Sequence, residues 1–187
     1  MNQDQPDVAP QPGTGAGWGQ AQSKTISWHD PRVTARALAG LSGLEAMSAI
    51  RDGAVAPPPI AAHFDFRVLQ IEPGRVSFGC NPDASAYNPI GMVHGGLVCT
   101  LLDTVLGCAV HTTLPPGVGY TSIELKVNYL RPVHLGAELT GHGWVTKPGR
   151  LRRGRGAGRR RQAGGHRLRQ LPDHRTAGLA SARSLSP

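Results

Sequence analysis

The sequence has little that could serve as a metal centre, a phosphate-binding loop or a membrane span. Its three cysteines, Cys80, Cys99 and Cys108, fit neither a disulfide framework nor zinc-ligand spacing, and we interpret them as free thiols of a reducing cytosol. The chain contains no G-x-G-x-x-G and no Walker-type loop. The longest apolar stretch, residues 97–110, contains Asp103 and is too short to span a bilayer. We expect a cytoplasmic protein without a metal, another cofactor or a membrane contact.

The last part of the chain also lacks lysine and aromatic residues. Residues 149–187 contain eleven Arg and one Asp, whereas residues 1–148 contain nine Lys or Arg and eleven Asp or Glu. The formal net charge of +8 therefore combines a mildly acidic region, at −2, with a basic tail, at +10.

Two explanations of the tail stay open. One is a segment that binds nucleic acid. The other is a reading-frame shift in GC-rich coding sequence, because Arg and Gly codons read one base later give mostly Val, Ala, Asp, Glu and Gly. We favour the frame shift, since segments that bind single-stranded nucleic acid usually include aromatic residues. A nucleic-acid partner is therefore not expected.

The composition divides the chain into three segments. Residues 1–29 are rich in Gln, Pro and Gly without periodicity, which predicts disorder. Residues 30–148 show helical and strand patterns, which predict one domain. Residues 149–187 show neither pattern, so we expect them to be disordered or frame-shifted and to add no stable part to the domain.

Within the domain the pattern predicts an α+β fold with an antiparallel sheet wrapped around one central helix. Apolar residues at helical spacing predict a helix from Asp30 to about Gly53, with weak points at Gly40 and Gly43. Alternating residues around Pro73 predict a hairpin. The other predicted elements are a central helix over 95–112 and two strands over 122–129 and 135–145.

The central helix carries the most informative residues. It is apolar nearly all round, so it should be buried. One small, polar stripe runs along it, formed by Gly96, Thr100, Asp103 with Thr104, Gly107 and His111. An unpaired buried carboxylate costs several kcal/mol. Asp103 is therefore expected either to perform chemistry or to be held by hydrogen bonds.

The spacing on this helix bears on how a site could be assembled. A helix N-terminus at Gly95 and Gly96 attracts a carbonyl oxygen or a developing oxyanion. Gly96 and Asp103 lie seven residues apart, which is about 10 Å along a helix axis. If both groups act on one carbon atom, the aspartate has to come from a second copy of the chain.

The motif N-x-x-G-x-x-H-G-G-x(6)-D, followed by T-S-I-E-L-K-V-N-Y-L-R-P, resembles the PaaI-type acyl-CoA thioesterases of the hotdog fold over roughly residues 32–147. The resemblance implies that the substrate is an acyl-CoA thioester, that no metal is used, and that the chain forms a homodimer or a dimer of dimers joined by sheet edges. It also implies two further strands within the sheet after residue 148, and these are apparently missing.

The resemblance also implies roles for particular residues. Asp103 would be the general base or nucleophile, and Asn88 would orient the water or the thioester. The amides of Gly95 and Gly96 would polarise the thioester carbonyl, and His94 would shape their turn.

Residues of the following strand are also implicated by the resemblance. Ser122, with Thr121 beside it, would contact the reacting group, while Lys126 and Arg131 are weaker candidates for contacts with CoA phosphates. A non-catalytic acyl-CoA-binding module, a hotdog dehydratase and a basic nucleic-acid-associated protein remain alternatives. Each candidate residue also has an ordinary structural interpretation: turn formation for Asn88, and close helix–strand packing for the two glycines.

Overall fold

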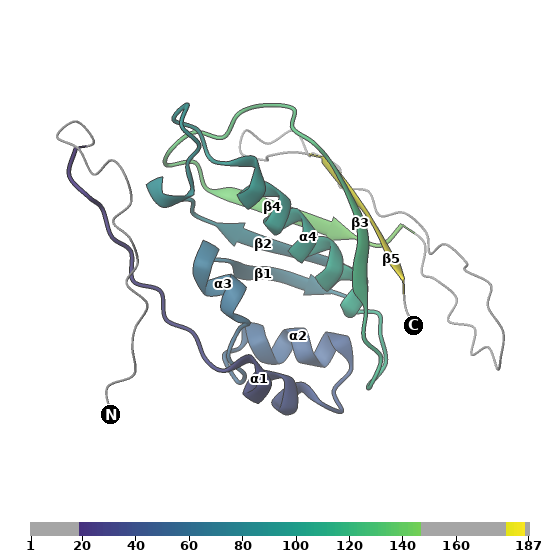
Figure 1. The fold of residues 1–187 in the computed structure, drawn as a ribbon. Coiled ribbons are helices and arrows are strands. Elements are labelled where there is room, and N and C mark those ends of the chain that lie inside the picture. The colour runs from purple at the N-terminus through teal and green to yellow at the C-terminus, as the bar shows by residue number, and fades with distance from the viewer. Residues whose placement is uncertain (1–18, 147–178, 186–187) are drawn as a thin grey trace, which may run out of the picture.

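A computed structural model of the chain describes residues 19–146 and 179–185 (Figure 1). Its helices are α1 (Pro31–Leu38), α2 (Gly43–Arg51), α3 (Pro59–Phe64) and α4 (Gly95–His111), with a short 3-10 turn, η1 (Ala84–Ala86), before α4. Its strands are β1 (Arg67–Glu72), β2 (Arg75–Cys80), β3 (Thr121–Asn128), β4 (Leu139–Trp144) and β5 (Leu179–Leu185). No helix in these ranges is long and apolar enough to cross a membrane.

The strands form two antiparallel sheets. One has the order β1-β2-β4, and the other pairs β3 with β5. The hairpin β1–β2 turns at Pro73-Gly74, where Gly74 has φ of 74° and so adopts a conformation that glycine favours. The structure confirms the predicted hairpin as β1 and β2 and the predicted central helix as α4. It also confirms the two predicted later strands as β3 and β4.

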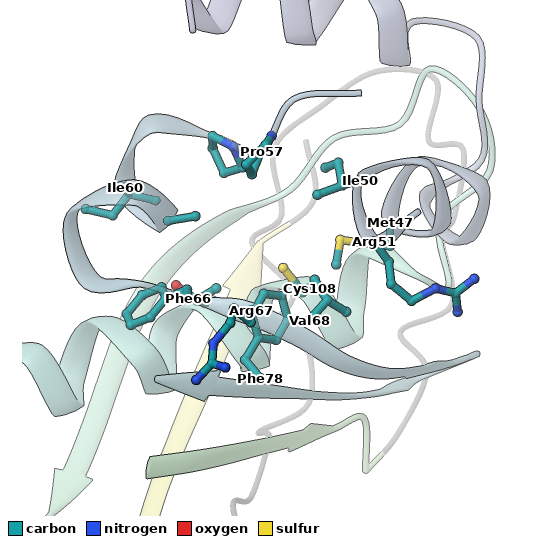
Figure 2. Close-up of a pocket in the computed structure, with 13 residues that line it drawn as sticks. Met47, Ile50, Arg51, Pro57, Ile60, Phe66, Arg67, Val68, Phe78 and Cys108 are labelled. Atoms are coloured by element: carbon teal, nitrogen blue, oxygen red, sulfur yellow. The ribbon is translucent and has the colours of Figure 1, made fainter. Parts of the chain in front are cut away.

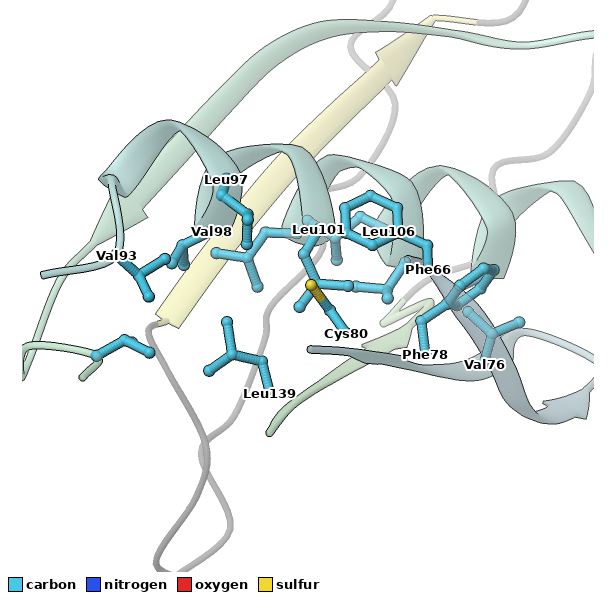
Figure 3. Close-up of a cluster of buried hydrophobic side chains, with 14 of the residues drawn as sticks. Phe66, Val76, Phe78, Cys80, Val93, Leu97, Val98, Leu101, Leu106 and Leu139 are labelled. Atoms are coloured by element: carbon cyan, nitrogen blue, oxygen red, sulfur yellow. The ribbon is translucent and has the colours of Figure 1, made fainter. Parts of the chain in front are cut away.

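The central helix α4 supplies much of the hydrophobic core. Leu102, Val105, Leu106 and Ala109 are at most 1% exposed. Figure 3 shows side chains from α4 packing against side chains from β2 and β4, such as Phe78 and Leu139. On β4, a Cβ atom at Gly143 would overlap the backbone of Val105, so helix and strand approach each other directly. This is the predicted α+β arrangement of an antiparallel sheet on one buried helix.

The predicted first helix is divided into two. The chain leaves α1 at Gly40, which has φ of 88°, and starts again with Ser42 as the N-cap of α2. Ser42 and Glu45 form a reciprocal capping box, with Ser42 N–H donating to Glu45 Oε2 at 2.7 Å. The expectation of one continuous helix was wrong, because the capping box gives the second half its own start. Helix α3, which follows Pro57 and Pro58, was not expected at all.

The predicted disordered segment overlaps the described residues only at 19–29. These residues form no helix or strand, but two of their side chains contact the domain. Lys24 Nζ lies 2.6 Å from Asp83 Oδ2, and this interaction lowers the pKa of Asp83 to about 2. The ring of Trp28 stacks on His63 with centroids 6.0 Å apart.

The basic tail is described only at residues 179–185. There the chain forms β5, which pairs antiparallel with β3 from Thr121 opposite Leu185 to Asn128 opposite Leu179. No strand was expected in this region from the sequence. The pairing has a simple physical cause, since the backbone N–H and C=O groups along β3 need partners and an extended segment supplies them. The rest of the tail lies outside the described residues.

Candidate active site

Asp103 lies in the middle of α4 on the side that faces β3. Its carboxylate is half-buried rather than fully buried. Ser122 Oγ, from β3, donates a hydrogen bond of 2.7 Å to Asp103 Oδ1. The two residues are 19 positions apart in the chain, and the structure places them in direct contact as the first half of the candidate site.

A bulge in β3 accounts for the orientation of Ser122. Simple alternation puts Ser122 on the opposite face from Leu125 and Val127, which pack against the core cluster. The pairing with β5 shifts register between Ser122 and Glu124. The extra residue reverses the alternation, and Ser122 reaches the helix. The sequence contains no clear signal for this bulge.

The start of α4 forms the second half of the candidate site. His94 is the N-cap, and its Nδ1 accepts the backbone N–H of Gly96 at 2.9 Å. A Cβ at Gly96 would lie only 2.8 Å from the same nitrogen, so glycine permits this close cap. His94 therefore caps the helix and shapes this turn. The Gly96 N–H was expected to face the substrate. In this structure it donates its hydrogen bond to the His94 imidazole instead.

Tyr129, just after β3, contacts the same turn and was not predicted to be a site residue. Its hydroxyl donates to the Gly95 carbonyl oxygen at 3.0 Å and lies 2.9 Å from Cys99 Sγ. A Cβ at Gly95 would lie 3.1 Å from Cζ of the tyrosine ring. The contact with Cys99 raises the pKa of Tyr129 to about 12, with burial adding to the shift. The hydroxyl therefore stays protonated at neutral pH and can donate a hydrogen bond.

Asn88 lies in the loop before α4, where its side chain organises the backbone. Its Oδ1 accepts the N–H groups of Ile90 at 3.2 Å and Met92 at 3.1 Å. This is the turn chemistry that an Asn before proline favours. The side-chain NH2 group is therefore the part of Asn88 that could donate a hydrogen bond to a ligand.

Two side chains on the second half of α4, Cys108 and His111, are held in their neutral forms. Burial, together with the negative charge of Asp103, raises the pKa of the Cys108 thiol to about 12. Burial also lowers the pKa of His111. Because a thiolate is the nucleophilic form of cysteine, Cys108 is not suited to attack at neutral pH. Asp103 is the carboxylate of the polar stripe.

The remaining predicted residues lie on β3 or beside the start of α4. Thr121 is exposed beside Ser122, and Lys126 is exposed on β3. Arg131 lines a hollow of about 440 Å³ at the start of α4, together with Gly95 and Tyr129. Nowhere in residues 19–146 or 179–185 do three His, Cys, Asp or Glu side chains gather as metal ligands.

A single copy keeps the two halves of the candidate site apart. Asp103 and Ser122 form one half, and His94, Gly95 and Gly96 form the other. Helix α4 is continuous between them, and seven residues of helix separate Gly96 from Asp103 by about 10 Å along the axis.

Comparison with known proteins shows a similarity to one family. Residues 90–152 match the Thioesterase superfamily. Acyl-coenzyme A thioesterase 13 from Homo sapiens is 32% identical over 85 residues, which are 44% of this chain and 59% of the human protein. The chain therefore spans less than two thirds of that relative.

Solved structures show the fold. The PaaI protein from E. coli superimposes with a TM-score of 0.61 at 17% identity, covering 79% of this chain and 95% of that protein. A Streptococcus mutans UA159 protein solved bound to acetyl CoA gives a TM-score of 0.53 at 20% identity, covering 65% and 88% of the two chains. The hotdog fold predicted from the sequence is confirmed. The family match ends at residue 152, close to the change of composition at 149.

The hydrogen bond between Ser122 and Asp103 leads to a prediction. We expect Ser122→Ala to lower kcat for thioester hydrolysis about tenfold, because a hydrogen bond to a charged group is worth about 1.5–3 kcal/mol. The melting temperature should change little, since Ser122 is exposed. Steady-state kinetics with Ser122→Thr as the control, which keeps the hydroxyl, checks this. Equal activity of Ser122→Ala and the parent chain would show that the contact has no catalytic role.

Proposed function

We propose that this chain hydrolyses acyl-CoA thioesters to a free acid and CoA. The observation that carries the proposal is a carboxylate held by a serine hydroxyl on the polar stripe of a buried helix whose first turn begins with two glycines. The match of residues 90–152 to the Thioesterase superfamily and the acyl-CoA thioesterase among the similar proteins support it. The acetyl CoA bound to a protein of the same fold supports a CoA thioester as ligand.

In the proposed reaction Asp103 acts on the thioester carbonyl carbon, either by removing a proton from an attacking water or by direct attack. The Ser122 hydroxyl orients the carboxylate through its hydrogen bond to Oδ1. Attack converts the carbonyl into a tetrahedral oxyanion, and its collapse breaks the C–S bond and releases CoA as the thiolate. If Asp103 attacks directly, water then hydrolyses the resulting anhydride to the free acid.

The oxyanion would be stabilised at the start of α4. The first amides of a helix lack partners in the helical hydrogen-bond ladder and carry partial positive charge. The Gly95 amide begins this helix, whereas the Gly96 amide becomes available when the substrate oxygen displaces the His94 imidazole. Tyr129 fixes the position of these amides by its hydrogen bond to the Gly95 carbonyl. Asn88 would then orient the thioester or the water through its side-chain amide.

We further propose that the working unit is a homodimer, or a dimer of dimers, in which the carboxylate of one subunit faces the helix start of the other. The separation of Gly96 and Asp103 along one helix supports this arrangement. We also propose a cytoplasmic location. Cys80, Cys99 and Cys108 are all free thiols, as expected of a reducing compartment.

The shared site makes a direct prediction for mixed subunits. Asp103→Asn and Asn88→Ala should each be inactive alone, yet together they should regain up to about a quarter of the parent activity, because a mixed two-fold dimer then has one intact site. Activity is measured after the two proteins are unfolded and refolded together, with each variant refolded alone as the control. Continued inactivity in a sample shown to contain mixed dimers would place the site within one chain.

Turnover tests the proposed function itself. Purified protein is mixed with acyl-CoA, and released thiol is followed with a chromogenic disulfide. Hydrolysis predicts many equivalents of CoA per subunit. Saturable acyl-CoA binding without release would instead indicate a non-catalytic binding module. Binding to any duplex DNA that weakens steeply with salt would favour the nucleic-acid alternative.

A further inference from the structure

Tyr120 is a half-buried aromatic residue that directly precedes β3. It lies two positions before Ser122, and residues two apart in an extended chain point to the same side. A Cβ atom added at Gly107 of α4 would lie 2.7 Å from both Cε2 and the hydroxyl oxygen of Tyr120. The tyrosine ring therefore lies directly against the backbone of the central helix, where a glycine leaves room for it.

Tyr120 and Ser122 contact α4 one helical turn apart. Ser122 contacts Asp103, and Tyr120 contacts Gly107, which follows Asp103 by four residues. Residues four apart on a helix lie on the same face. The Tyr120 ring also lies beside the imidazole of His111, the next position of the polar stripe, with ring centroids 5.6 Å apart. The two contacts of this short segment are therefore neighbours on the stripe.

The contact between Ser122 and Asp103 needs support from its surroundings. Ser122 is exposed, so its hydrogen bond to Asp103 competes with hydrogen bonds to water. Pairing with β5 fixes the direction of β3 but not its distance from the helix, because β5 lies beside β3 in the same sheet. Residues 115–117, just before this segment, are exposed. Tyr120 supplies the aromatic surface that can hold this end of β3 against α4.

The ring of Tyr120, rather than its hydroxyl, provides the firm part of this contact. The hydroxyl has a hydrogen bond with the Cys108 thiol, and burial raises the pKa of both groups, so both are neutral at pH 7. The Cys108 side chain also lines a cavity of about 280 Å³, together with Met47 and Val68 (Figure 2). Because the cavity leaves the thiol room to move, the Gly107 backbone is the more rigid support for the ring.

We propose that Tyr120 is a positioning residue that sets the spacing between α4 and β3, so that the Ser122 hydroxyl meets the Asp103 carboxylate. The proposal rests on the proposed hydrolase function, in which this hydrogen bond orients the carboxylate. Tyr120 acts through Ser122 and not on the substrate. Removing the ring should therefore reduce the rate as much as removing the Ser122 hydroxyl, and no more.

Steady-state kinetics test this assignment. Tyr120→Ala should lower kcat about tenfold with little change in KM, as expected for Ser122→Ala. Tyr120→Phe keeps the ring and should retain the parent kcat. Tyr120→Ala combined with Ser122→Ala should lose no more than either single variant, because two changes that act through one contact are not additive. Phe64→Ala, which truncates a half-buried aromatic residue on α3, is the matched control and should lower the melting temperature but not kcat.

Crystal structures of the variants separate this proposal from the hydrolase function. The distance of 2.7 Å between Ser122 Oγ and Asp103 Oδ1 should be kept in Tyr120→Phe and lost in Tyr120→Ala, even if no preparation hydrolyses acyl-CoA. Gly107→Ala gives the same readout if Tyr120→Ala does not fold, because its methyl group displaces the ring while alanine favours the helix. An unchanged distance in the variant that lacks or displaces the ring, or a rate loss that adds to that of Ser122→Ala, would overturn the proposal.

Discussion

Asp103→Asn is expected to lower the rate of acyl-CoA hydrolysis by a factor of about a hundred or more, since a positioned general base contributes on the order of 10²–10⁴-fold. The amide has nearly the same shape as the carboxylate and can still accept the hydrogen bond from Ser122 Oγ. The fold should therefore be preserved. Thiol release under saturating substrate measures the loss, and the melting temperature verifies the fold.

Asp83→Asn is a suitable control for that experiment. It also removes one carboxylate charge, but at the ion pair with Lys24, far along the chain from α4. Its activity should equal that of the parent chain. Near-normal turnover in a folded Asp103→Asn protein would remove Asp103 from the mechanism, whichever of the two chemical routes had been assumed.

Correcting the reading frame after residue 149 is expected to give the largest gain in stability. Among the described residues, β1-β2-β4 and β3-β5 form separate sheets. Two additional alternating strands would add ladder hydrogen bonds and bury apolar surface along free edges. Because 1 kcal/mol shifts the melting temperature of a domain this size by about 2–4 °C, we expect an increase on the order of 10 °C. Activity should rise with it.

The native protein decides which tail exists. Mass spectrometry of protein purified from its own cells should detect peptides of the alternative frame, and the chain with the corrected frame should be compared with this sequence by calorimetry. Peptides covering residues 168–187 of the printed sequence would show that the arginine-rich tail is real. The frame-shift hypothesis would then have to be abandoned, and β5 would be the tail's contribution to the sheet.

The parts of the fold predicted from sequence are those whose side chains follow a simple period. The hairpin alternates around Pro73-Gly74, and α4 is apolar on almost every side, so both were recognised. The division between α1 and α2 was missed, although Gly40 and Gly43 had been noted as weak points. There the capping box of Ser42 and Glu45 outweighs an apolar period that continues across the break.

The candidate site was predicted as a set of residues rather than as a geometry. Asp103 and His94 stand out because a carboxylate inside an apolar helix and a histidine before two glycines are unusual. The orientation of Ser122 depends on a bulge, and the role of Tyr129 depends on its ring lying against Gly95. Both are tertiary contacts between distant segments, which local patterns do not encode.

A structure of the protein with a CoA analogue that keeps the carbonyl but replaces the thioester sulfur by a methylene tests the central claim most directly. We expect the carbonyl oxygen to lie about 2.7–3.1 Å from the Gly95 or Gly96 amide. We also expect Asp103 of a second subunit to face the carbonyl carbon. A carbonyl bound away from both the helix start and any Asp103 carboxylate would contradict the account.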